Sequence, residues 1–200
     1  MSGKVTESQV LYDSSKYAQI SDEEKLFPLN GKHKKSLSVI LDRAKEKVFS
    51  AKSDKLRDEA FEELQKVFDE RISIVALRMK DCSETTIMIF LSFHNVLKVR
   101  ENIGADVRAR AIEGFCQLVT KLHNLTGCVV LAGADLNQQL IEPIPYPILD
   151  YMPTPRRLRS GQIDYFILES DDHLRESVQP FDFIGSVMHG YLKLHALNLN

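Results

Sequence analysis

Apolar residues recur every three or four positions over two long stretches of the chain, which is the spacing of an amphipathic helix. Between residues 36 and 70 this spacing predicts two helices, interrupted near residues 50–53. The same spacing predicts a third helix over residues 106–123, with Gly127 placed to end it.

Shorter runs of β-branched and large apolar residues predict strands. These runs cover residues 72–79, 85–93, 128–132, 163–168 and 191–194. The polar segment between the first two has the length of a hairpin loop, which predicts adjacent antiparallel strands. A short β-prone run at residues 9–12, followed by turn-forming residues at 13–16, predicts one more strand and a hairpin loop. Because strands and helices interleave, the chain is expected to be an α/β protein with a sheet at its core.

Composition and charge narrow the class of protein. The residues are 44% hydrophobic and 27% charged, which is typical of an ordinary globular protein, and a length of 200 residues fits one domain or two small ones. The formal net charge of -2 gives no overall attraction to nucleic acid or anionic membranes. Any phosphate binding must therefore come from a local basic cluster.

The cysteines and the N-terminus indicate an intracellular protein, cytoplasmic or nuclear. Cys82, Cys116 and Cys128 lack the spacing of a disulfide framework or a zinc site, so buried free thiols are expected. The first ten residues are polar, without the apolar core of a secretory signal. No stretch is apolar over the roughly 18 residues that a membrane span requires, so no span is expected.

The most informative segment joins an apolar strand to Gly133, Asp135 and Asn137. If the backbone stays extended, the last two side chains point to the same side. A carboxylate that orients a water and an amide that holds a phosphate oxygen suit phosphoryl chemistry. The alternative is an Asx turn after the strand, because Asp and Asn favour turns. Both interpretations remain open.

A second candidate is a basic loop stiffened by prolines at residues 153–159. Its guanidinium groups could bind phosphates, or the loop could simply be solvated, and both interpretations stand. The arginines are Arg156, Arg157 and Arg159.

The order of these motifs resembles the endonuclease/exonuclease/phosphatase (DNase I-like) superfamily. The matching pieces are a strand ending at His94, the Gly133 to Asn137 segment, a strand starting with Asp164, and a closing strand with His189. The likeness covers roughly residues 9–194. It implies one domain over residues 1–200, a mixed β-sandwich flanked by helices (αββα) that lacks the first strands. Residues 36–70 would be a helical insertion.

The resemblance also implies roles for individual residues. Asp135 would orient the attacking water, Asn137 would contact the phosphate and His94 would assist. Asp164 would pair with His189 and fix its tautomer. Mg²⁺ would be the cofactor of an active member, and nucleic acid or another phosphate-bearing ligand would be the partner.

Two departures from the family bear on activity. The family's Asn on its first strand and its metal-binding Glu on the second have no counterpart, and the acid of its Ser-Asp-His motif aligns with Met188. Methionine does not ligate a hard cation such as Mg²⁺. A degenerate or partial phosphodiesterase or nuclease, weakly active or inactive as given, is therefore expected. The alternatives are a non-catalytic module of the same fold that binds phosphate ligands or partners, and a C-terminal fragment of a longer active hydrolase.

Overall fold

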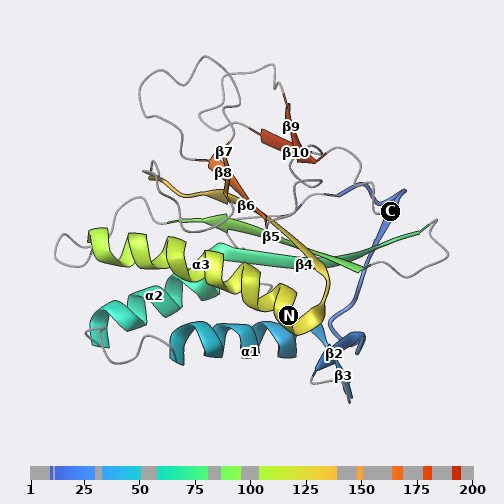
Figure 1. Ribbon diagram of the computed structural model, residues 1–200, viewed down its shortest axis with the longest axis horizontal. Helices are drawn as coiled ribbons and strands as arrows, with labels where there is room; N and C mark the ends of the chain where they lie inside the picture. The colour runs from blue at the N-terminus through green and yellow to red at the C-terminus, as the bar shows by residue number, and fades with distance from the viewer. Residues whose placement is uncertain are drawn as a thin grey trace.

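The computed structural model describes residues 10, 12–29, 33–50, 58–80, 87–95, 104–138, 148–150, 164–168, 178–181 and 191–194. A six-stranded mixed sheet forms its centre (Figure 1). In spatial order its strands are β1 (Tyr17–Gln19), β4 (Ile72–Met79), β5 (Ile87–His94), β6 (Val129–Asp135), β8 (Asp164–Leu168) and β7 (Ile148–Asp150). β5 and β6 are parallel, whereas the other neighbouring pairs in this sheet are antiparallel.

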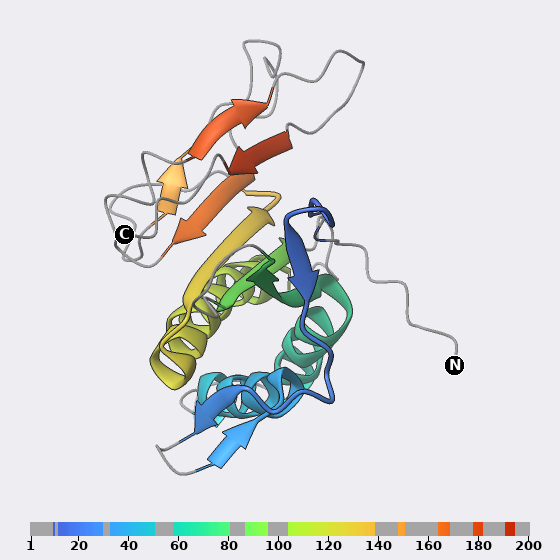
Figure 2. The same cartoon turned by 90° about the vertical axis from the view of Figure 1, so that its right-hand side faces the viewer.

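Three helices lie on one face of this sheet (Figure 2). They are α1 (Leu37–Ser50), α2 (Asp58–Arg71) and α3 (Gly104–Thr126). α3 connects the parallel strands β5 and β6, as such a pair requires a long crossover. α3 contacts β6, α2 contacts β4 and α3, and α1 packs against α3. Helices and a mixed sheet make the protein an α/β protein, which confirms the predicted class.

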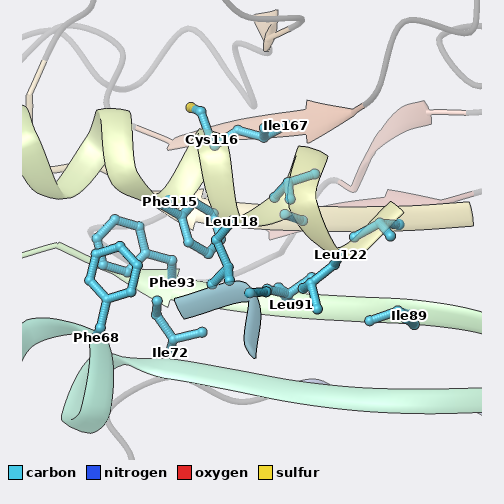
Figure 3. Close-up of a cluster of buried hydrophobic side chains, with 14 of the residues drawn as sticks. Phe68, Ile72, Ile89, Leu91, Phe93, Phe115, Cys116, Leu118, Leu122 and Ile167 are labelled. Atoms are coloured by element: carbon cyan, nitrogen blue, oxygen red, sulfur yellow. The ribbon is translucent and has the colours of Figure 1, made fainter. Parts of the chain in front are cut away.

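The core lies between the helices and alternate positions of the central strands. Side chains in successive strand positions point to opposite faces. The core positions are Ile89, Leu91 and Phe93 of β5, and Val130, Ala132 and Ala134 of β6. The Phe93 and Phe115 rings meet here with their centroids 4.5 Å apart (Figure 3). It follows from the alternation that His94 and Asp135 lie on the face away from the helices.

Two further hairpins accompany the sheet. β2 (Phe27–Leu29) pairs with β3 (His33–Lys35), and the buried ring of Phe27 joins the core under the helices. β9 (Val178–Phe181) pairs with β10 (Tyr191–Leu194), and both strands lie near β7 and β8, away from the helices (Figures 1 and 2). The part of the chain that the structure describes thus contains one six-stranded sheet and two smaller ones.

The structure confirms most of the predicted elements. Two helices span the predicted 36–70 region, and the helix predicted at 106–123 extends over Gly104–Thr126. Gly127 follows it with a positive φ of 67°, and its N–H donates to the carbonyl of His123 at 2.7 Å. The strands predicted at 72–79 and 85–93 pair antiparallel as expected.

The strand predicted at residues 9–12 is wrong for the described residues, because neither Val10 nor Tyr12 lies in a strand. The turn after it is present, held by Asp13 Oδ1, which accepts from the N–H and hydroxyl of Ser15 at 2.9 and 2.6 Å. The strand β1 follows this turn instead of preceding it. No helix among the described residues is long and apolar enough to cross a membrane.

Candidate functional site

Three of the candidate residues occupy one row across adjacent strands. His94 is the register partner of Asp135 in the parallel β5 and β6 pair. Asp135 is in turn the register partner of Asp164 in the antiparallel β6 and β8 pair. β5 and β6 therefore end where β8 begins, and residues far apart in the sequence meet at one end of the sheet. The carboxyl ends of parallel strands are common ligand-binding positions in α/β folds.

His94 and Asp135 face each other across the strand ends. The Nε2 atom of His94 lies 3.9 Å from Oδ2 of Asp135, and their side chains are 35% and 15% exposed. This distance is too long for a hydrogen bond, and it allows an ion pair when the imidazole is protonated. The pair is thus partly open to solvent.

The backbone turns immediately after Asp135. Oδ1 of Asp135 accepts the backbone N–H of Asn137 at 3.0 Å, and Asn137 has a φ of 49°. These two features define an Asx turn that ends in the left-handed region, where Asn is tolerated better than most residues. The extended arrangement, in which both side chains point the same way, is therefore absent. One carboxylate oxygen of Asp135 is bound to backbone, and the other faces His94.

The amide of Asn137 also contacts the protein. Its Nδ2 donates to the backbone carbonyl of Asn95 at 2.7 Å. This bond joins the segment after β6 to the segment after β5. An amide held in this way stabilises the turn.

Asn95 is a site residue that the sequence analysis missed. It directly follows His94 and is fully buried, with 0% exposure. Its N–H donates to the carbonyl of Asp135 at 2.8 Å, and its Nδ2 lies 3.1 Å from the carbonyl of Leu136 and 3.3 Å from that of Arg108 in α3. The signal in the sequence is slight, because an Asn after a strand is as typical of an exposed turn as of a buried one.

The side chains that the structure describes do not by themselves form a Mg²⁺ site. Among them no group of three or more His, Cys, Asp or Glu side chains could hold a metal ion. Mg²⁺ binds near-octahedrally through oxygen atoms, usually from carboxylates. Asp135 offers one carboxylate, of which one oxygen already accepts from backbone, and its neighbour on β5 is an imidazole, while its neighbour on β8, Asp164, is described by its strand position alone.

Several candidate residues lie outside the described part of the chain. They are Arg156, Arg157, Arg159 and His189. Of Asp164 the structure describes the strand position and register. Among the cysteines, Cys116 is a buried free thiol, as predicted, and burial raises its pKa to about 12. Cys128 is a half-buried free thiol, whose pKa is raised by the same cause.

Comparison with known proteins adds no family to these observations. No protein-family model matches the chain, and no curated protein is significantly similar to it in sequence. The resemblance to the endonuclease/exonuclease/phosphatase superfamily accordingly depends on the ordered motifs alone.

Proposed function

We propose that the protein is a degenerate member of the endonuclease/exonuclease/phosphatase superfamily, with its αββα sandwich. In this proposal it binds a phosphate-bearing ligand at the shared end of β5, β6 and β8, and hydrolyses phosphodiesters weakly or not at all. The observation that carries the proposal is the row of His94, Asp135 and Asp164 across three neighbouring strands.

The row adds evidence for a common site that the separate motifs do not provide. A His at a strand end, a Gly-x-Asp segment and an Asp at a strand start each have ordinary structural explanations. A shared site requires their backbones to be neighbours, and the register of β5, β6 and β8 meets that requirement. The half-exposed imidazole and the single carboxylate oxygen that faces it offer a polar surface for a small anionic group and a water.

Weak hydrolysis follows from the groups that face this surface. Cleavage of a phosphodiester requires a cation or several fixed donors to stabilise the charge of the transition state. The side chains that the structure describes here supply one imidazole and one carboxylate, and the N–H of Asn137 already donates to that carboxylate. Loss of a single electrostatic donor commonly lowers the rate by about a hundred- to a thousandfold.

The proposal includes an intracellular location, in the cytoplasm or the nucleus. Cys116 is a buried free thiol, and Cys128 is half-buried and also free. Unpaired cysteines are typical of reducing compartments, whereas secreted domains more often pair them. Fractionation of cells that express the tagged protein tests this part.

The hydrolysis part is tested with purified protein, plasmid DNA and bis-p-nitrophenyl phosphate, in Mg²⁺ or Mn²⁺. We expect the rate to equal that of the Asp135→Ala variant for both substrates. A metal-dependent rate that is lost in Asp135→Ala would show an active hydrolase and overturn this part of the proposal.

The binding part is tested with a short fluorescein-labelled single-stranded oligonucleotide, by fluorescence anisotropy over a range of salt concentrations. Alanine at all three arginines of the 153–159 loop should weaken binding and make the negative slope of log affinity against log salt less steep by about 2. A control variant removes the same charge from three exposed lysines elsewhere in the chain, Lys25, Lys34 and Lys66. Equal losses in both variants would mean non-specific attraction and would count against a site.

A further inference from the structure

Among the described residues, two polar side chains are buried, those of Asn95 and Thr126. A buried polar group is costly unless it is hydrogen-bonded, so each needs a structural reason. The hydroxyl of Thr126 bonds within the end of its own helix, donating to the carbonyl of Leu122 at 2.7 Å and accepting from the N–H of Cys128 at 3.1 Å. Thr126 is therefore a local cap.

Asn95 instead bonds to two separate segments, the turn after β6 and the helix α3. Its backbone exchanges contacts with both ends of the Asx turn, because its N–H donates to the carbonyl of Asp135 and its carbonyl accepts from the amide of Asn137. Its own amide donates to Leu136, inside that turn, and to Arg108 in α3. The four bonds span 2.7 to 3.3 Å.

These bonds restrain both members of the candidate pair from the protein side. His94 precedes Asn95 directly, so the bonds of Asn95 fix the carboxyl side of the His94 backbone. Asp135 precedes Leu136, so the same bonds fix the backbone on both sides of the Asp135 carbonyl. The anchor is α3, which packs on the opposite face of the sheet. A side chain on the helix face thus controls two side chains on the other face.

We propose that Asn95 is a positioning residue of the site, which ties the ends of β5 and β6 to α3 and thereby sets the distance between the His94 imidazole and the Asp135 carboxylate. Its effect on the geometry of the pair is independent of what the site binds. Its effect on ligand affinity rests on the proposed function.

The test is a double-mutant cycle read by NMR in the full chain. The ¹H–¹³C cross-peak of the His94 ring is assigned by its loss in His94→Gln, and its movement on Asp135→Asn is measured at one fixed pH. This movement reports how closely the two side chains interact. In an Asn95→Leu background, which keeps the size and removes the amide, we expect the movement to fall to less than half.

Two further variants make the result specific. Asn95→Ala also removes the amide and adds no charge or bulk, so it should give the same loss and serves if Asn95→Leu does not fold. Thr126→Val removes the other buried polar group and should leave the His94 response unchanged. An unchanged response in the folded Asn95 variants overturns the inference, and an equal loss in Thr126→Val does so too.

Ligand binding provides the second arm. Where the wild-type protein binds the labelled oligonucleotide, Asn95→Leu should weaken that binding by on the order of tenfold, and Thr126→Val should not. If the wild-type protein binds no oligonucleotide, the proposed function fails, while the NMR cycle still decides the role of Asn95.

Discussion

Replacement of Asn137 separates the two contributions of this residue to the turn after β6. Its φ of 49° lies in the left-handed region, and its amide donates to the carbonyl of Asn95 at 2.7 Å. Asn137→Gly keeps the backbone conformation accessible and removes the amide. Asn137→Ala removes the amide and also places a Cβ in the left-handed region.

The expected losses in the free energy of unfolding follow from these differences. Loss of the amide bond costs about 1 kcal/mol, and glycine adds about 0.5–1 kcal/mol through the entropy of the unfolded chain. For alanine, the left-handed conformation costs about 1–2 kcal/mol in addition to the lost bond. We therefore expect a loss of about 2 kcal/mol for Asn137→Gly and about 2–3 kcal/mol for Asn137→Ala.

Urea unfolding followed by circular dichroism measures these losses, with equal slopes required for the comparison. An Asn137→Ala variant as stable as the wild type would refute the structural role assigned to the turn. A glycine variant with wild-type stability that no longer binds the oligonucleotide would refute it in another way, because the amide would then serve the ligand. Binding is measured without urea, so both variants are compared with the wild type in the folded state.

Two other substitutions and one chemical reaction test the packing. Gly114→Ala should destabilise the protein by about 1–2 kcal/mol in urea unfolding despite the better helix propensity of alanine, because the new Cβ would lie 2.9 Å from Cζ of the buried Phe68. Phe68→Leu in the same chain should recover part of this loss, and additive losses would contradict the clash. A Cβ added at Gly127 meets no atom within 4 Å, so the effect of Gly127→Ala on stability comes from the φ of 67° alone. We expect a lower Tm that corresponds to a loss of about 1 kcal/mol, and a smaller loss for Gly127→Asn. Since burial raises the pKa of Cys116 to about 12, its thiol stays protonated at pH 8. In the folded protein it should therefore react with iodoacetamide more slowly than Cys128, which peptide mapping measures. Equal rates of the two thiols before urea is added would disprove the burial of Cys116.

The long elements could be predicted from the sequence because they carry enough periods to define a pattern. The 3.6-residue repeat identifies the three helices of the described residues, and the apolar runs identify β4, β5, β6 and β8. The strands β2, β3, β7 and β9 were not predicted, since three or four residues contain no measurable period. Their pairing is decided by tertiary contacts, as is the choice of Tyr17–Gln19 over residues 9–12 as the first strand.

The candidate site was predictable to a smaller extent. That His94 and Asp135 meet follows from two apolar strands joined by a helix, which favours a parallel pair whose carboxyl ends coincide. The direction of the Asp135 and Asn137 side chains was not predictable, because an extended strand end and an Asx turn use the same residues. The burial of Asn95 depends on carbonyl groups of β6 and α3 that approach only in the folded chain.

The crossover between β5 and β6 affects when the candidate site forms during folding. The antiparallel β4 and β5 are close in sequence, so the loop between them closes at a small entropic cost, whereas β6 must wait for the whole of α3. We therefore expect the β4 and β5 hairpin to form first and the contact between His94 and Asp135 to be among the last. The amide proton of Asn95, which donates to Asp135, reports that moment in pulse-labelled hydrogen exchange and should be protected later than the amides of β4. Until this protection develops, a nascent chain can carry native helices and a native hairpin and still lack the proposed site.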